Sequence, residues 1–289
     1  MTPADFEQWL LQPTSLRRPL VMGVLNVTPD SFSDGGRLDD PGEIAEIAIK
    51  MADAGADLID IGGESTRPGS MPVPEAEQLR RVVPVIQAIK AAMSIRVDCS
   101  VTLSIDTTRA AVAEAALDAG VTLLNDISAG RDDPAMLRLA AARQAPIVLM
   151  HMQGTPATMQ IDPMYKDVTA EVRDFLAERL AAAEAAGVLS HRILLDPGIG
   201  FGKTQDHNLT LLRRLSDIAA LDRPLLVGTS RKGFIGHITG VTDPAQRLFG
   251  TAATVAWSIA NGARVVRVHD VGPMSQVVRM VRAIQVCGG

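Results

Sequence analysis

Cysteine and aromatic residues are rare in this chain. Its 289 residues include two cysteines, Cys99 and Cys287, and phenylalanine, tryptophan and tyrosine together make up 3%. The cysteines are far apart in the sequence and belong to no metal-ligand or redox motif, so a disulfide-stapled fold and a cysteine metal site are both disfavoured. We expect two reduced thiols and no disulfide.

The chain also lacks an excess of positive charge and any long apolar run. Its formal net charge is -5 and its pI is about 5.6. Nucleic acids and anionic membranes attract clustered positive charge, so we expect neither as a partner and favour a small-molecule enzyme instead. Asp5 and Glu7 lie where a signal peptide would be apolar, and no stretch reads as a bilayer span, so we expect a cytoplasmic protein.

The chain instead shows one repeated pattern, in which a short β-branched run alternates with a longer alanine-rich helical segment. Glycines end several of the helical segments where the next strand pattern begins, namely Gly55, Gly120, Gly187 and Gly262. The expected strands are 19–26, 57–63, 102–107, 122–128, 146–152, 193–198, 224–230 and 264–270. Eight such units predict a (β/α)8 TIM barrel, and a doubly wound open sheet is the alternative.

No linker interrupts the pattern, so we expect a single barrel domain. Residues 1–18 form an N-terminal extension that lies across the bottom of the barrel or frays, and residues 19–289 form the domain itself.

Polar residues lie at the carboxyl ends of the predicted strands. In a barrel the loops at the carboxyl ends of the strands build the active site. Any one of these residues alone is as readily a capping or solvated residue, but together they indicate one active-site mouth. They are Asn26, Glu64, Asp106, Asn125, His151, Asp196, Lys232, Arg267 and His269.

Four loops have unusual compositions. Residues 26–36, NVTPDSFSDGG, predict a lid, and residues 64–69, ESTRPG, offer a hydroxyl and a guanidinium to an anion. Residues 229–236, TSRKGFIG, add Ser230, Arg231 and Lys232 near the position where barrels commonly bind phosphate. In residues 196–204, DPGIGFGKT, the glycines let the backbone approach a flat ligand, and Lys203 is interpreted as solvated.

These motifs together resemble the dihydropteroate synthase family. The matching runs are GVLNVTPDSFSDGG, GGESTRPG, SIDTTR, NDIS, LMHMQG, LLDPGIGFGKT, VGTSRKGFIG and RVHD. The resemblance covers nearly the whole chain after about residue 18. It implies a barrel transferase of folate biosynthesis, usually a homodimer, that condenses (7,8-dihydropterin-6-yl)methyl diphosphate with 4-aminobenzoate to give 7,8-dihydropteroate and pyrophosphate. The expected course is SN1-like loss of diphosphate followed by attack of the aryl amine.

The resemblance also implies roles for individual residues. Asp106, Asp196 and Lys232 would be catalytic, because fixed carboxylates favour the positive charge that develops on the pterin. The implied pterin-binding residues are Asp106, Asn125, Met150, Asp196, Phe201, Gly228, Lys232 and Arg267.

The second substrate and the diphosphate have their own implied residues. The diphosphate would bind Asn26, Thr66, Arg67, Arg267 and His269, and 4-aminobenzoate would bind Phe32, Thr66, Pro68, Ser230 and Lys232. The amide oxygen of Asn26 would be a ligand of Mg²⁺, and Asp34 would join it when the lid closes. Because sulfonamides mimic 4-aminobenzoate, we predict a sulfonamide-sensitive enzyme.

Other function classes remain open at this point. They are a pterin-binding barrel of a corrinoid-dependent methyl transfer system, a non-catalytic paralogue that only binds, and another phosphate-handling barrel enzyme. The predicted lid and the Ser-Arg-Lys cluster argue against the first, and the full set of strand-end residues argues against the second.

Overall fold

The computed structural model describes residues 1–28, 40–65, 69–96 and 100–287, which form a closed barrel of parallel strands. Strand order follows the chain from β1 to β8, and β8 pairs with β1 to close the barrel. The strands are β1 Leu20–Asn26, β2 Leu58–Gly62, β3 Thr102–Asp106, β4 Leu123–Asp126, β5 Ile147–Met150, β6 Ile193–Asp196, β7 Leu225–Val227 and β8 Ala263–Val268. The TIM-barrel prediction is confirmed, and the open-sheet alternative is wrong because no strand edge is left between β1 and β8.

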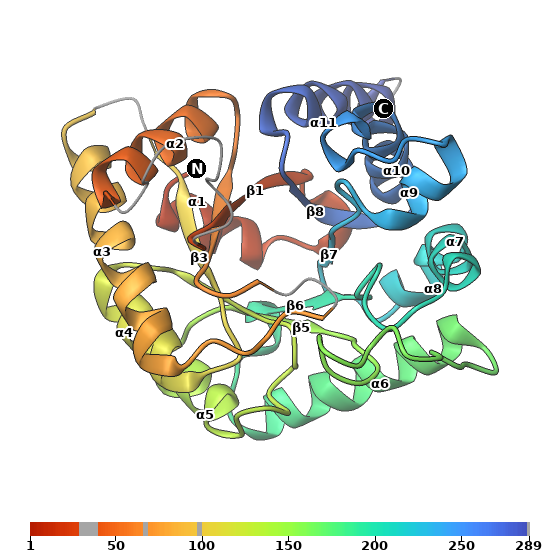
Figure 1. Ribbon diagram of the computed structural model, residues 1–289, viewed down its shortest axis with the longest axis horizontal. Coiled ribbons are helices and arrows are strands. Elements are labelled where there is room, and N and C mark those ends of the chain that lie inside the picture. The colour runs from red at the N-terminus through yellow and green to blue at the C-terminus, as the bar shows by residue number, and fades with distance from the viewer. Residues whose placement is uncertain (29–39, 66–68, 97–99, 288–289) are drawn as a thin grey trace.

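Helices surround the barrel (Figure 1). They are α1 Pro3–Leu11, α2 Pro41–Asp53, α3 Glu75–Ser94, α4 Ala110–Ala119, α5 Ala135–Ala142, α6 Val168–Ala185, α7 Gln205–Arg213, α8 Leu215–Ala219, α9 Gly233–Thr239, α10 Leu248–Ala260 and α11 Val271–Val286. The predicted glycine stops are confirmed: Gly55, Gly120, Gly187 and Gly262 all have φ between +98° and +109°, a region that only glycine adopts freely.

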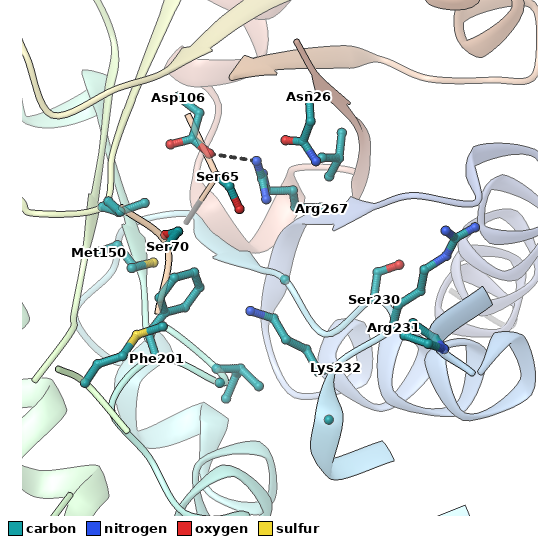
Figure 2. Close-up of a pocket in the computed structure, with 18 of the residues that line it drawn as sticks. Asn26, Ser65, Ser70, Asp106, Met150, Phe201, Ser230, Arg231, Lys232 and Arg267 are labelled. Carbon is teal, nitrogen blue, oxygen red and sulfur yellow. Dashed lines mark hydrogen bonds and ion pairs between the residues drawn. The ribbon is translucent and has the colours of Figure 1, made fainter. Parts of the chain in front are cut away.

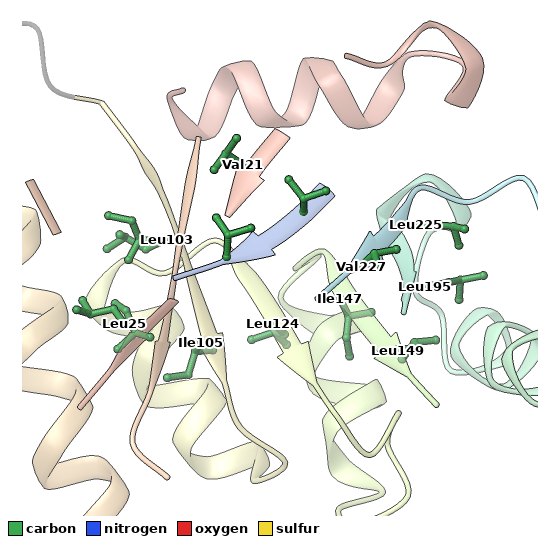
Figure 3. Packing of buried hydrophobic residues seen from close by; sticks show 14 of the residues in the cluster. Val21, Leu25, Leu103, Ile105, Leu124, Ile147, Leu149, Leu195, Leu225 and Val227 are labelled. Carbon is green, nitrogen blue, oxygen red and sulfur yellow. The ribbon is translucent and has the colours of Figure 1, made fainter. Parts of the chain in front are cut away.

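Alternate residues of each strand are buried either between the barrel and the helices or inside the barrel, because successive side chains of a strand point to opposite faces. One set packs outward against the helices, as Figure 3 shows for Leu103, Ile105, Leu124 and Leu149. The other set fills the inside of the barrel near the amino-terminal ends of the strands. This second set is Leu20, Met22, Leu58, Leu123, Val148, Leu194, Leu226 and Val265.

Helix α1 closes the bottom of the barrel. Phe6, Trp9 and Leu10 are buried in the same cluster as the lower inward-facing side chains, and Figure 3 shows α1 crossing the ends of the strands. The Trp9 indole donates to the backbone carbonyl of Arg18 at 2.9 Å, which joins the helix to the start of β1. We therefore propose that residues 1–18 are an extension that completes the domain formed by residues 19–289.

Among the described residues, none of the helices has both the length and the apolar character needed to cross a bilayer. Cys287 carries a free, exposed thiol. Cys99 lies outside the described residues.

Candidate active site

A cleft of about 1160 Å³ opens at the carboxyl ends of the strands. Seven of the nine strand-end residues singled out in the sequence line it: Asn26, Asp106, Asn125, Asp196, Lys232, Arg267 and His269. Met150, Phe201, Gly228 and Ser230 line it as well. Figure 2 shows Asp106, Arg267 and Asn26 on one side, Met150 and Phe201 on another, and Lys232 extending between them.

The floor of the cleft is the next inward-facing layer of the barrel. Six residues of this layer follow a lower-layer apolar residue by two positions, which keeps the side chain pointing inward. Leu123 is followed by Asn125, Val148 by Met150, Leu194 by Asp196, Leu226 by Gly228, Val265 by Arg267 and Leu58 by Asp60. The change from an apolar layer to a polar layer is therefore the boundary between the structural part of the barrel and its chemical part.

Arg267 lies across this floor between two carboxylates. Its Nε donates to Asp60 Oδ2 at 2.6 Å, and its Nη2 donates to Asp106 Oδ2 at 2.8 Å. Asn125 Nδ2 also donates to Asp60 Oδ2, at 2.9 Å. Asp60 was missed in the sequence, although a charged residue inside an apolar strand, in phase with Leu58, is the signal that could have identified it.

Two floor carboxylates, Asp106 and Asp196, are almost inaccessible to solvent, with relative exposures of 8% and 6%. Burial raises the pKa of Asp106 to about 7, while the charge of Arg267 opposes the shift. Burial also raises the pKa of Asp196 to about 6, although its Oδ1 accepts a hydrogen bond from the Gly198 amide at 2.7 Å. Both carboxyl groups therefore have pKa values close to neutral pH.

Lys232 and Phe201 meet above the floor. The Lys232 ammonium lies 4.1 Å from the centre of the Phe201 ring, within the range of a cation–π contact. Burial lowers the pKa of Lys232 to about 8, and the nearby Arg267 charge adds to this effect. Phe201 also packs against an apolar wall made of Ile127, Met150, Met152 and Met159. One flank of the cleft is therefore apolar and the other cationic.

Ser230 and His269 form a second polar corner. The Ser230 hydroxyl lies 3.0 Å from His269 Nδ1 and accepts from the His269 backbone amide at 3.1 Å. Burial and the charge of Arg267 lower the pKa of His269 to about 4, so the imidazole is neutral at neutral pH. Neighbouring Arg231 has φ of +60° and forms an ion pair with Asp270 at 2.6 Å. The predicted Ser-Arg-Lys cluster is confirmed as part of the cleft lining.

Two of the strand-end residues do not line the cleft, and the expectation that they face the mouth was wrong. Glu64 accepts hydrogen bonds from the Val73 amide at 3.1 Å and from Gln78 Nε2 at 2.8 Å, so it fixes the loop after β2. His151 is buried beside Lys203, and burial, with the charge of Lys203 adding to it, lowers the His151 pKa to about 2. Both side chains have hydrogen-bond partners within the protein.

Lys203 is not solvated, which corrects the interpretation from sequence. It is 3% exposed, and its ammonium lies 2.9 Å from each of His151 Nδ1, the Gly198 carbonyl and the Phe201 carbonyl. These three acceptors match the three N–H donors of an ammonium group. Gly198 allows this packing, since a Cβ at that position would approach the His151 carbonyl to 1.9 Å. Lys203 therefore fastens the glycine loop that carries Phe201.

Asn26 is the predicted metal ligand, and its side chain lies at the rim next to Gly62. Within the described ranges, no group of three or more histidine, cysteine, aspartate or glutamate side chains is arranged to hold a metal. A single amide oxygen fits a hard cation that keeps most of its water and takes other ligands from a phosphate. The other lid and second-loop predictions, at Phe32, Asp34, Thr66, Arg67 and Pro68, lie outside the described residues.

Comparison with known sequences gives consistent similarities. The sequence profile of pterin binding enzymes matches residues 22–269. A dihydropteroate synthase of Synechocystis is 48% identical over 268 residues, which cover 93% of this chain and 91% of that protein. The dihydropteroate synthase of Escherichia coli is 44% identical, with 93% of this chain and 92% of that protein covered.

Solved structures show the same similarity. A Xanthomonas albilineans dihydropteroate synthase with 4-aminobenzoic acid superimposes with a TM-score of 0.86 at 44% identity, covering 93% of this chain and 94% of that one. A Yersinia pestis dihydropteroate synthase in complex with a sulfonamide drug has a TM-score of 0.86 at 44% identity, covering 95% and 96%. A further Xanthomonas albilineans structure, with 7,8-dihydropteroate, has a TM-score of 0.82 at 41% identity, covering 93% and 94%.

Proposed function

Since this chain belongs to the pterin-binding enzyme family, among its dihydropteroate synthases, we propose how its cleft carries out their reaction. The enzyme is a transferase of folate biosynthesis that condenses the dihydropterin diphosphate with 4-aminobenzoate to give 7,8-dihydropteroate and pyrophosphate. The observation that carries the mechanism is the polar barrel layer of Asp106, Asn125, Asp196 and Arg267, with Lys232 above it in the same cleft.

The pterin ring lies on this floor. Its edge is rich in N–H donors, which suit acceptors that are fixed in place. Asp196 accepts from that edge, and Asp106 and Asn125 pair with the remaining ring nitrogens. Arg267 stacks its guanidinium plane on the ring face, and Met150, Phe201 and the space left by Gly228 shape the slot. Lys232 donates to the ring from above.

Bond cleavage places positive charge on the dihydropterin, because the methylene loses its diphosphate before the amine attacks. The ionised carboxylates of Asp106 and Asp196 stabilise this charge more than they stabilise the neutral ground state. The aryl amine is a weak base, so it needs positioning more than deprotonation. The reaction therefore depends on charge placed in the floor rather than on a strong general base.

The diphosphate lies at the rim, where Arg267, His269 and Asn26 line the cleft. The family resemblance adds Thr66 and Arg67 to this subsite. Asn26 would contribute one oxygen to Mg²⁺, which would supply positive charge that makes the diphosphate a better leaving group. Removal of Mg²⁺ with a chelator should abolish pyrophosphate release while leaving binding of a pterin without phosphates unchanged. Calorimetry with that pterin distinguishes the two effects.

Sulfonamides and 4-aminobenzoate share one subsite in this proposal, formed by Phe32, Thr66, Pro68, Ser230 and Lys232. Ser230 supports it because its hydroxyl is fixed against His269 at the edge of the cleft. Sulfamethoxazole should therefore inhibit competitively with 4-aminobenzoate. Inhibition that is absent at high sulfamethoxazole concentration would contradict the assignment.

A second copy of the chain is the proposed partner. Ile238 on α9, Phe249 and Trp257 on α10, and Met280 and Ile284 on α11 are large apolar side chains with 51–87% of their surface exposed. Helix α10 packs against both α9 and α11 (Figure 1). A face of this kind commonly marks an interface. Light scattering should give twice the monomer mass, and Phe249→Asp should give the monomer mass.

The test of the function is pyrophosphate release by the purified protein, which we also expect to find in the cytoplasmic fraction of cells. Release should require both substrates and Mg²⁺, and it should collapse in Asp196→Asn. Release in the absence of 4-aminobenzoate, or an active Asp196→Asn variant, would contradict the mechanism proposed for the floor.

A further inference from the structure

Asp60 is a fully buried carboxylate of the inward-facing layer whose other members form the floor of the cleft. It lies in the middle of β2, has 0% exposure and does not line the cleft. Its Oδ2 accepts from two side chains that do line it, Arg267 at 2.6 Å and Asn125 at 2.9 Å. Its Oδ1 is buried and accepts no hydrogen bond from the described residues.

Burial of a carboxylate inside a protein is energetically unfavourable. A buried carboxylate must be paired and hydrogen-bonded, and exchange of a buried ion pair for apolar packing is often neutral or stabilising. The same strand holds Leu58 at the equivalent position one layer lower. Asp60 therefore lies one layer above this apolar packing, among the polar side chains of the barrel, which points to a role other than packing.

The first consequence of Asp60 is the orientation of the Asn125 amide. An ionised carboxylate accepts hydrogen bonds and donates none. Asn125 must therefore turn its NH₂ group down toward Asp60, and its carbonyl oxygen is the atom left for a ligand. A neutral amide at position 60 would remove this constraint, because it could accept or donate, and the Asn125 amide could then turn over.

The second consequence is the orientation of the Arg267 guanidinium. Asp60 on β2 binds its Nε, and Asp106 on β3 binds its Nη2 (Figure 2 shows the second contact). Two carboxylates on neighbouring strands thus hold two edges of one planar group. Two such contacts fix the plane, whereas one contact leaves it free to rotate.

We propose that Asp60 is a positioning residue for the pterin subsite, which sets the polarity of the Asn125 amide and the plane of the Arg267 guanidinium without touching the ligand. This inference rests on the proposed function. It assigns to Asp60 the recognition of the heterocycle, and it assigns no part in binding 4-aminobenzoate, whose proposed residues Ser230 and Lys232 do not contact Asp60.

The test is Asp60→Asn, which keeps the shape of the side chain and removes its charge. The dissociation constant for 6-hydroxymethyl-7,8-dihydropterin should rise by about 10- to 100-fold, the scale at which misplaced contacts weaken a site. The KM for 4-aminobenzoate should stay within about twofold of its original value, since its subsite is separate. The matched control is Asp57→Asn, at the residue directly before the start of the same strand, where Asp57 pairs with Arg18 at 2.6 Å. It should leave both constants unchanged.

A second readout separates positioning from a purely structural role. The pKa of Asp106 is raised first by burial and then by the charges of Asp60, Asp126 and Glu64, while Arg267 lowers it. Pterin affinity falls at low pH as Asp106 becomes protonated, and this fall is the acid limb of the pH profile. Removal of the Asp60 charge should therefore shift the acid limb to lower pH in Asp60→Asn. Loss of fold stability alone would leave that limb in place.

The outcomes are distinct. Pyrophosphate release by the unmodified enzyme tests the proposed function by itself, so failure there is separate from failure of the Asp60 assignment. Unchanged pterin affinity and an unchanged acid limb in a folded Asp60→Asn would overturn the assignment. If Asp60→Asn does not fold, Asp60→Ser, which is smaller and can still accept one bond, gives the same test. Unfolding of both variants at 25 °C would also overturn it, because Asp60 would then be a stability residue.

Discussion

Pterin binding should depend steeply on pH, because the two floor carboxylates must be ionised to accept N–H groups. The pKa of Asp106 is raised to about 7 and that of Asp196 to about 6. At pH 5 the pterin-binding form requires two deprotonations, at a cost of about 100-fold from Asp106 and about tenfold from Asp196. The affinity should therefore fall by up to about 1000-fold between pH 8 and pH 5, with a steeper slope below pH 6.

The loss of pterin affinity at high pH has a different origin. The pKa of Lys232 is lowered to about 8 by burial and by Arg267, so its ammonium loses its proton as the pH rises above that value. Because the proposed contact needs the ammonium as donor, affinity should fall again at high pH. The optimum should therefore lie between the pKa values of Asp106 and Lys232.

Calorimetry is the appropriate assay, with 6-hydroxymethyl-7,8-dihydropterin as the ligand so that no diphosphate titrates. Titrations in buffers of different ionisation enthalpy measure the protons exchanged, and binding should release one to two protons near pH 5.5 if carboxylates ionise on binding. The protein must remain folded at each pH, which thermal unfolding checks. An affinity that is constant from pH 8 to pH 5, or binding without proton release, would refute this reasoning.

The remaining predictions concern stability. Because the Asp196 pKa is raised from 3.8 to about 6 by folding, its stability contribution is full below pH 4 and is lost as the pH rises through 6. Thermal unfolding should thus show Asp196→Asn more stable than the parent at pH 8, by up to about 3 kcal/mol, and equal to it at pH 4. Lys203→Met removes the donor to His151 Nδ1 and to the Phe201 carbonyl, and leaves the Gly198 carbonyl with only the Phe201 amide, so denaturant titration should show a loss of about 2 to 4 kcal/mol, and the KM for the pterin substrate should rise as the Phe201 loop loosens. An unchanged KM would contradict the role of Lys203. Trp9→Ala should cost about 3 to 5 kcal/mol in unfolding free energy with kcat/KM unchanged, since α1 packs at the far end of the barrel; a fall in kcat/KM for a folded variant would contradict that separation.

The fold was readable from the sequence because two local rules operate in every unit. Glycines such as Gly120 and Gly262 end helices where only a left-handed residue fits. Strand residues alternate between the helix side and the barrel interior, so aliphatic residues in β5 and β6 are buried on both faces. These rules depend on the local chain alone, and together they predicted all eight strands.

The site was only partly readable, because the direction of a side chain outside a strand depends on the path of its loop. Asn125, Asp196 and Arg267 are in phase with the barrel interior, and their places in the cleft follow from that phase. Lys203 comes from a loop that folds back over His151, and the periodicity of the sequence cannot predict the path of such a loop. Asp60 was readable in principle, since it shares the phase of its neighbours.

The restraint of Arg267 has a consequence for inhibitor design. With Nε and Nη2 engaged by carboxylates, the guanidinium offers a ligand its flat face on those sides rather than its charged edge. A compound that carries an acidic group toward those nitrogens must break buried ion pairs and will gain little affinity. A flat heterocycle that covers the guanidinium keeps both pairs intact and adds a stacking contact. Compounds for this subsite should therefore be selected for a planar, electron-rich ring with donors on its edge.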